Sequence, residues 1–206
     1  MKPDVGIVWG SGIIDSSETF ERPLRTLSVR GPRTRQRMLE LGYDCPEIFG
    51  DPALMLPMVY RPAVEKTFEV GIIPHFAELS SFKMQPLPAG WKLIDVTQDL
   101  EQVVGDIARC HRTASSSLHG VIVSHAYGVP SAWIEAKASL HGDGIKFADY
   151  FASVGIVEPV RPGSWSSLLD DDLTSVDFSL PDVTNLQAQL RPVSYTHLTL
   201  PTSDLV

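Results

Sequence analysis

The stretch RTASSSLHGVIVSHAYGVPSAWIEA, residues 112–136, predicts a strand, a helix and a second strand in immediate succession. RTASSS and SAWIEA predict the two short strands. HGVIVSHAYG predicts the apolar helix between them, which Gly128 ends because glycine readily adopts the left-handed conformation found after a last helical turn. Strand, helix and strand in this order favour parallel pairing of the two strands.

The same alternation continues on both sides of this unit. FEVGIIPH and WKLIDVT predict strands before it, DLEQVVGDIARC predicts a helix, and GIKFADYFASVG predicts a helix after it. A chain in which strands alternate with helices is typical of an α/β protein with parallel sheets.

The N-terminal part repeats the pattern on a smaller scale. DVGIVWGSG and TLSVRGP predict strands, and PRTRQRMLELG predicts a helix with proline in its first turn. EIFGDPALML predicts a short strand and then a helix start, with Asp51 as the N-cap. A doubly wound sheet usually contains about five or six strands, so we expect this first domain to be incomplete.

These elements predict an α/β protein with two Rossmann-like parallel-sheet domains. A partial N-terminal domain is expected at 1–58, a linker at 59–66, a C-terminal domain with the donor site at 67–162, an acidic extension at 163–192, and a terminal segment at 193–206. The terminal segment contains VSYTHLTLPT, which resembles a translated sequencing adapter, so we expect it to be foreign to the protein.

Composition excludes several classes of function. The chain has 206 residues and a net charge of −8, without a run of Lys and Arg, which argues against nucleic-acid binding. No stretch of about 18 apolar residues predicts a transmembrane helix. Cys45 and Cys110 are isolated, as expected of buried small residues in a reducing compartment.

The segment SSSLHG combines hydroxyl groups with a histidine at the start of a predicted helix. Ser115, Ser116 and Ser117 lie at the carboxyl end of a strand, and His119 and Gly120 fall in the first turn of the helix. A helix N-terminus attracts anions, and ligands of open parallel sheets bind at the carboxyl ends of strands. The segment therefore predicts a phosphate or carboxylate site with a proton donor. A serine N-cap followed by a packed histidine is the alternative.

Three further strand ends carry polar residues. Arg30 could bind an anion through its guanidinium, or lie at the surface. His75 could be catalytic or structural, and Glu135 could accept a hydrogen bond from a sugar or nucleoside hydroxyl. The GSG turn places Gly10 and Ser11 at another strand end, but lacks the third glycine of a dinucleotide fingerprint.

No other spacing indicates catalysis. The sequence contains no P-loop, no nucleophile elbow and no Cys/His pattern of a metal site. His111 and His141 are expected in polar loops, and His125 on another face of the helix that carries the SSSLHG segment. We interpret all three as solvated or packed residues.

Taken together, six segments resemble the polysaccharide pyruvyl transferase family and occur in the order of that family. They are VWGSG, SVRGPRT, GDPALMLP, GIIPH, SSSLHGVIVSHAYGVPSAWI and KFADYFAS, from Val8 to about Ser153. The resemblance implies a fold similar to the glycosyltransferase type B architecture. A glycine turn that the family usually has before the first of these segments is absent here.

The resemblance also implies the activity, which is transfer of a pyruvyl group from phosphoenolpyruvate to two sugar hydroxyls, forming a pyruvate ketal without a cofactor. The acceptor would be a glycan or a lipid-linked saccharide of bacterial exopolysaccharide biosynthesis. The protein would be cytoplasmic or peripheral to the inner membrane.

The same resemblance, read with the chemistry of the residues, assigns the roles. His119 is the expected general acid and base, with His75 as second candidate. Arg30 and the SSSLHG segment would hold the donor. Two alternatives stay open: a nucleotide-sugar glycosyltransferase, in which Glu135 would bind the ribose, and an inactive anion- or glycan-binding fragment.

Overall fold

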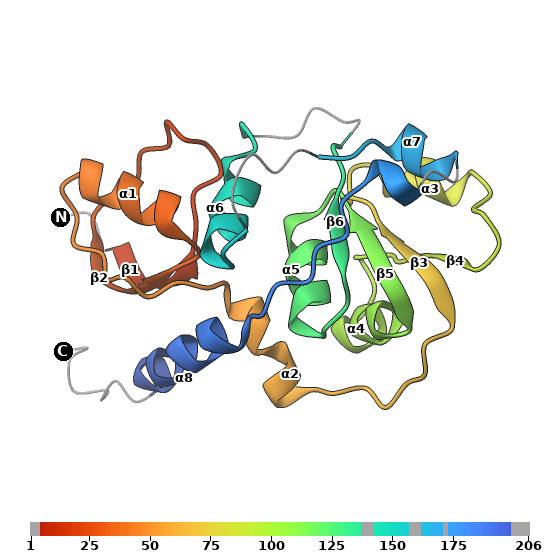
Figure 1. Cartoon of the computed structure of the whole chain (residues 1–206). Helices are drawn as coiled ribbons and strands as arrows, with labels where there is room; N and C mark the ends of the chain where they lie inside the picture. Colours follow the sequence, from red (N-terminus) through yellow and green to blue (C-terminus); the bar gives the residue numbers. More distant parts are fainter. Residues whose placement is uncertain (1–4, 137–141, 157–161, 171–172, 199–206) are drawn as a thin grey trace. The chain divides into compact units, whose positions relative to one another are not determined.

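The computed structural model describes residues 5–136, 142–156, 162–170 and 173–198, and the chain divides into two compact units (Figure 1). Unit 1 consists of Met1–Met55, Gly142–Glu158 and Asp182–Val206, and unit 2 consists of Leu56–His141 and Pro159–Pro181. Each unit is thus assembled from separate stretches of chain, whereas the domains expected from the sequence were continuous.

Unit 2 is built on a four-stranded parallel sheet in the order β4-β3-β5-β6. The strands are β3 (Phe68–Ile73), β4 (Trp91–Leu93), β5 (Cys110–Ser115) and β6 (Ser131–Trp133). The predicted α/β class with parallel strands is confirmed. His111 lies within β5, so its prediction as a loop residue was wrong.

Among the described residues of unit 2, six helical segments accompany this sheet. They are α2 (Leu56–Val59), α3 (Leu79–Lys83), α4 (Leu100–Ala108), α5 (Leu118–Ala126), α7 (Trp165–Leu169) and the 3₁₀ turn η2 (Leu173–Ser175). Helix α5 connects β5 to β6 and buries seven of its nine residues, which explains its apolar sequence. The sequence predicted α4 and α5, but not the short helices α2 and α3.

A core cluster fixes the short helices of unit 2. Phe82 of α3 meets Trp165 of α7 edge-on, with ring centroids 4.8 Å apart, and both are buried. Ile72 of β3 and Ile134 belong to the same cluster. Short helices gain little from local propensity, so this tertiary packing is what holds α3 and α7.

The backbone at Ser179 lies antiparallel to β6, next to Ser131. Ser131 of β6 donates its N–H to the Ser179 carbonyl oxygen at 2.9 Å, in an antiparallel bridge. The same carbonyl lies 3.1 Å from Nε2 of His125, a residue of α5 that is 1% exposed. Because a carbonyl oxygen can only accept, Nε2 carries the proton. His125 is therefore a packed residue, as predicted.

In its described part, unit 1 contains a parallel pair of strands and four helical segments. They are β1 (Val5–Ser11), β2 (Pro23–Val29), α1 (Pro32–Glu40), the 3₁₀ turn η1 (Pro52–Met55), α6 (Ile145–Ser153) and α8 (Thr184–Leu198). Helix α8 crosses position 193, where the adapter-like segment was expected to begin. Cys45 and Cys110 are both buried free thiols, as the composition indicated.

Asp149, which is fully buried in α6, joins three elements of unit 1. Its Oδ1 accepts hydrogen bonds from the backbone N–H groups of Arg33 and Thr34 at 2.9 and 3.0 Å. The Asp149 carboxylate thereby caps the N-terminus of α1. Its Oδ2 accepts the Thr34 hydroxyl at 2.6 Å and lies 3.2 Å from Nε of Arg30. Gly31 permits this approach, because a Cβ there would lie 2.1 Å from the Asp149 carbonyl oxygen.

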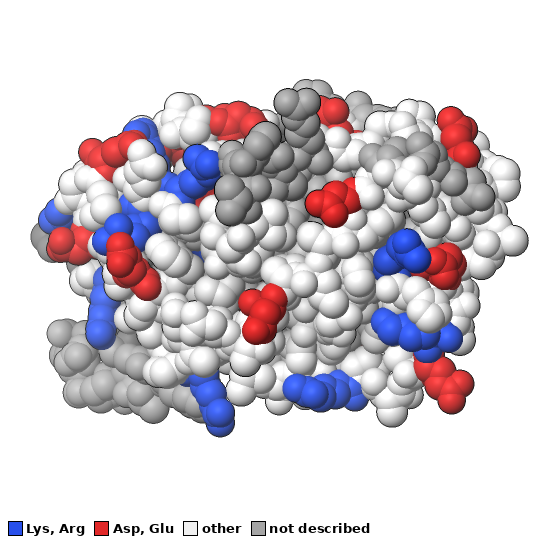
Figure 2. Space-filling view, in the orientation of Figure 1, with Lys and Arg blue, Asp and Glu red and all other residues white. Residues whose placement is uncertain are grey.

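The molecular surface mixes both signs of charge. Figure 2 shows acidic and basic side chains intermingled on one face of the molecule, without an extended basic patch among the residues coloured there.

Replacing Asp149→Asn should destabilise unit 1 by about 3–5 kcal/mol, because it leaves the Arg30 guanidinium buried without its anion. The measurement is hydrogen exchange of the α1 amides, with urea unfolding alongside. Asp44→Asn is the control, since Asp44 is exposed, and it should change stability by less than about 0.5 kcal/mol. Unchanged protection of α1 in the Asp149 variant would contradict the capping role.

The buried histidine of α5 should make unit 2 sensitive to acid. Desolvation lowers the pKa of His125 from 6.5 to about 4. Between these values the unfolded chain binds the proton and the folded chain does not, so stability falls as pH falls through this window and levels off below it. From pH 7 to pH 5 the loss should be about 2 kcal/mol.

Urea unfolding at the two pH values measures this loss. His125→Gln should reduce the difference between pH 7 and pH 5, whereas His111→Gln, at an exposed position, should leave it as in the wild type. Equal pH sensitivity of wild type and His125→Gln would show that another group is responsible.

Candidate functional site

The carboxyl ends of β3 and β5 lie side by side in unit 2, since Ile73 pairs with Ser115. The chain after β3 reaches His75, and the chain after β5 opens helix α5. The structure thereby brings together six residues that the sequence singled out, which we call the carboxyl-edge cluster: His75, Ser115, Ser116, Ser117, His119 and Gly120.

Ser116 connects the two strand ends. Its Oγ accepts the backbone N–H of His75 at 2.9 Å and donates to Oε2 of Glu78 at 2.6 Å. Both Ser116 and Glu78 are buried. No sequence pattern singled out Glu78, because its hydrogen bond to Ser116 joins residues that lie 38 positions apart. The hydroxyl of Ser116 is thus used to hold the backbone at His75.

Ser115 and Gly120 build the turn between β5 and α5. The Ser115 Oγ lies 2.9 Å from the Ile73 carbonyl oxygen and accepts the Ser117 N–H at 3.0 Å. A Cβ at Gly120 would lie 2.3 Å from this Oγ, so glycine lets the helix pack closely onto the strand ends. These two residues shape the site and, like Ser116, have their polar atoms engaged within the protein.

Within the described residues, the side chain of Ser117 is not engaged in capping helix α5. The residue occupies the N-cap of α5 in an extended conformation. The helix that follows has nine residues, and its first N–H groups carry partial positive charge. His119 lies in the first turn and is exposed. A hydroxyl and an imidazole thus stand at the positive end of a helix.

His75 presents a second imidazole. Its Nδ1 accepts the Ala77 N–H at 3.3 Å, so the neutral ring carries its proton on Nε2. The ring lies 4.3 Å from that of Phe76, which is 67% exposed. The half-buried His75 therefore has a defined tautomer at the same edge as His119.

Glu135 follows β6, the strand next to β5. Its backbone N–H donates to the Gly163 carbonyl oxygen at 2.9 Å, and its side chain is exposed. An exposed carboxylate at the end of the neighbouring strand can accept hydrogen bonds from hydroxyl groups.

The remaining predicted residues belong to unit 1. Ser11 is the last residue of β1, and Arg30 directly follows β2. The Arg30 N–H donates to the Ser11 carbonyl oxygen at 2.9 Å. Gly10 has a φ of +68° and faces Pro52 so closely that a Cβ would lie 2.4 Å from its ring. The side chain of Ser11 is exposed.

Arg30 is more enclosed than the sequence indicated. It is 6% exposed, its Nη2 donates to the Ile13 carbonyl oxygen at 2.6 Å, and its Nε faces Asp149. The guanidinium also lies against Gly12, where a Cβ would be 2.4 Å from Cζ. The second glycine of the GSG turn thus makes room for Arg30, whose orientation is fixed by Asp149.

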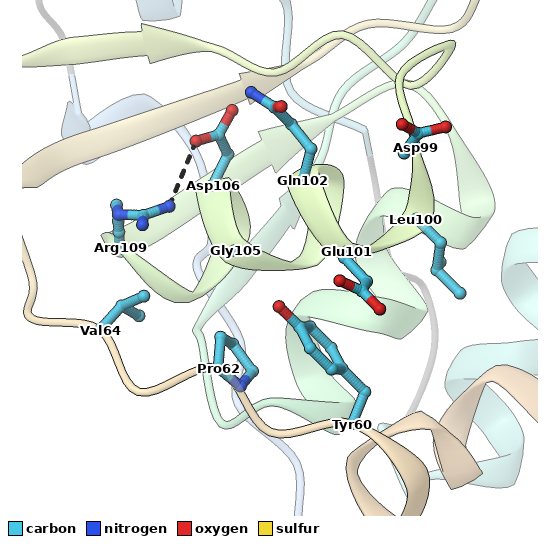
Figure 3. A pocket seen from close by; sticks show the side chains of 10 residues that line it. All are labelled: Tyr60, Pro62, Val64, Asp99, Leu100, Glu101, Gln102, Gly105, Asp106 and Arg109. Atoms are coloured by element: carbon cyan, nitrogen blue, oxygen red, sulfur yellow. Dashed lines mark ion pairs between the residues drawn. The ribbon is translucent and has the colours of Figure 1, made fainter.

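A pocket of about 760 Å³ lies along α4 in unit 2 (Figure 3). Figure 3 shows the side chains of Tyr60 and Glu101 pointing toward the same space, and an ion pair of 3.6 Å between Asp106 and Arg109. Arg109 precedes β5, so this end of the pocket lies at the amino end of the strand. None of the predicted site residues lines the pocket.

The described residues include neither a metal-binding cluster nor a membrane-spanning helix. No group of three or more His, Cys, Asp or Glu within them is arranged to hold a metal ion. No helix in the same ranges is both long and apolar enough to cross a membrane.

Comparison with known proteins agrees with the arrangement of these motifs. A family model described as polysaccharide pyruvyl transferase matches residues 4–137. An uncharacterized protein of Acanthamoeba polyphaga mimivirus is 30% identical over 184 residues, which cover 84% of this chain and 63% of that protein. The chain thus spans less than two thirds of the length of this relative. No solved structure matches the chain.

The matched residues contain most of the predicted site. They include the GSG turn, Arg30, His75, the whole carboxyl-edge cluster and Glu135, and they make up well over half of the chain. The chain therefore belongs to the polysaccharide pyruvyl transferase family.

Proposed function

We propose that this protein transfers a pyruvyl group from phosphoenolpyruvate to two hydroxyls of a polysaccharide or its precursor, forming a pyruvate ketal. The observation that carries the proposal is the carboxyl-edge cluster of unit 2, in a chain that belongs to this family. There, two imidazoles lie at neighbouring strand ends beside the N-terminus of α5. That combination provides both an anion site and proton transfer.

The donor brings a phosphate and a carboxylate. The first N–H groups of α5 and the hydroxyl of Ser117 supply hydrogen-bond donors for one anionic group in unit 2. Arg30 supplies a guanidinium in unit 1, where Asp149 fixes its orientation. The remaining serines contribute indirectly, because they hold the strand ends in place.

Ketal formation requires a proton at the methylene carbon of phosphoenolpyruvate and removal of a proton from the attacking hydroxyl. The first sugar hydroxyl adds to the central carbon, and the C–O bond to phosphate breaks. The second hydroxyl then adds to the same carbon, and its proton passes to the departing phosphate. Imidazole transfers protons near neutral pH. His119 is the general acid and base in this proposal, with His75 as second candidate, since both rings lie at the carboxyl edge.

The acceptor is proposed to be a glycan or a lipid-linked saccharide. Glu135, exposed at the end of β6, would accept a hydrogen bond from a sugar hydroxyl. Since phosphoenolpyruvate is a cytoplasmic metabolite, we expect the reaction in the cytoplasm or at the inner face of a membrane. Each unit would correspond to one Rossmann-like domain of the glycosyltransferase type B class.

His119→Gln should lower turnover by about 10²- to 10⁴-fold, the usual contribution of a positioned general acid or base. The assay is phosphate release and ketal formation with phosphoenolpyruvate and a panel of saccharides. His111→Gln, with the same chemical change at an exposed position of β5, should keep full turnover. Wild-type turnover in His119→Gln would remove this residue from the mechanism.

Arg30→Lys should weaken phosphoenolpyruvate binding by about 10- to 100-fold, because one charge-assisted hydrogen bond is lost. Lysine is chosen so that Asp149 keeps a cationic neighbour. Calorimetric titration measures the affinity, and Arg25→Lys at an exposed position of β2 is the control. Competition by nucleotide sugars, with no effect of phosphoenolpyruvate, would favour a glycosyltransferase instead.

A further inference from the structure

The pocket along α4 lies within unit 2 and shares no residue with the carboxyl-edge cluster (Figure 3). One wall is the face of α4 between Asp99 and Arg109. The other is the chain segment that carries Tyr60, Pro62 and Val64. Its volume of about 760 Å³ falls within the usual range of small-molecule sites, about 300–1,000 Å³. The pocket is therefore large enough to hold a ligand of its own.

A glycine in the middle of α4 forms part of the pocket wall. Gly105 lies in the helix interior, where glycine is less favourable than alanine because it loses more backbone freedom on folding. Among the described residues, a Cβ here would meet a single atom outside the helix backbone within 4 Å, Nη1 of Arg109 at 3.2 Å. This atom is the end of a flexible side chain, and the φ of Gly105 is not positive. The fold therefore does not require the glycine, and its effect is to leave a hollow in the helix face.

Three polar side chains that line the pocket are not used by the fold. The Tyr60 hydroxyl, the Glu101 carboxylate and the Gln102 amide form no hydrogen bond or ion pair within the described part of the chain. Figure 3 shows the side chains of Tyr60 and Glu101 pointing toward the same space. The hydroxyl and the amide can donate and accept, whereas the carboxylate accepts. Together they match a ligand that carries several hydroxyl groups.

The charges of the pocket favour a neutral ligand. Asp106 is paired with Arg109 at 3.6 Å and with Lys92 at 3.7 Å. Asp99 and Glu101 stand at the start of α4, where the partial positive charge of the helix N-terminus offsets them. A cation would meet this positive end and Arg109, whereas an anion would meet two carboxylates. A ligand with hydroxyl groups and no net charge avoids both kinds of repulsion.

We propose that the pocket along α4 binds a neutral saccharide. A pyranose ring has apolar C–H faces and a rim of hydroxyl groups, so it suits an aromatic face combined with hydrogen-bonding groups. The rings of Tyr60 and Pro62 supply the apolar contact. The Tyr60 hydroxyl, Glu101 and Gln102 bind the sugar hydroxyls, and Gly105 lets the sugar approach the helix backbone. The proposal does not depend on pyruvyl transfer, because none of these residues belongs to the carboxyl-edge cluster.

The test is an NMR titration of the full chain with maltotriose, cellotriose and lactose, of which at least one should shift the backbone amides of α4. Tyr60→Ala should weaken that binding by about 10- to 100-fold, because a stacking face and a hydrogen bond are lost. Tyr60→Phe should weaken it by about 2- to 10-fold, since the ring is kept. Phe76→Ala removes an exposed ring elsewhere on unit 2 and should bind as the wild type does.

A second variant tests the hollow in α4. Gly105→Leu fills it with a good helix former, so saccharide binding should weaken by at least about 10-fold while the thermal midpoint equals or exceeds that of the wild type. A lowered midpoint would show that the glycine serves the fold, and would overturn the proposal. Unchanged binding in Gly105→Leu or in Tyr60→Ala would overturn it as well, and so would unshifted α4 amides with all three saccharides.

Titration with a tri-lysine peptide separates a saccharide site from an acidic docking groove. A charged ligand loses affinity when the salt concentration rises from about 0.05 M to about 0.5 M, whereas a neutral saccharide does not. We expect saccharide binding that is independent of salt. Binding of tri-lysine without binding of any of the saccharides would overturn the proposal. Since phosphoenolpyruvate is absent from these titrations, their outcome is the same whether or not the chain forms a ketal.

Discussion

The buried carboxylate of Asp149 is the interaction on which unit 1 depends. It caps α1 in place of Gly31, which has no side chain to do so, and it neutralises Arg30 at the end of β2. A buried charge is tolerated only when it is paired and hydrogen-bonded. Asp149 is hydrogen-bonded to α1 and paired with Arg30. The guanidinium itself donates to the Ile13 carbonyl oxygen. The position of the guanidinium, and hence any anion site around it, follows from this single side chain.

In the carboxyl-edge cluster of unit 2, some residues hold the structure and others are positioned for chemistry. The Ser115 hydroxyl is hydrogen-bonded to the backbone and fixes the turn into α5. The Ser116 hydroxyl is hydrogen-bonded to Glu78 and to the N–H of His75, and it fixes the backbone at His75. Ser117 and His119 stand at the helix start. A rigid turn beneath an accessible hydroxyl and imidazole is the arrangement that a preorganised site requires.

The sequence predicted the six strands β1 to β6 and the helices α1, α4, α5 and α6, because their apolar patterns and glycine ends are local signals. It missed α3, which depends on the packing of Phe82 against Trp165, residues far apart in the chain. It identified Arg30 but not Asp149, since the bonds from Asp149 to α1 span 115 and 116 residues. An aspartate within the apolar KFADYF segment was the available signal, because a charge in such a place needs a partner.

The long separation between Asp149 and α1 has a consequence for biosynthesis. At about 5–20 residues per second, the ribosome adds Asp149 roughly 6–23 s after Arg33, and the whole of β3 to β6 is made in between. During that interval the N-terminal strands and α1 are present without Asp149, the carboxylate that pairs with Arg30. Unit 2 can begin to fold before the contacts from Asp149 to α1 form in unit 1.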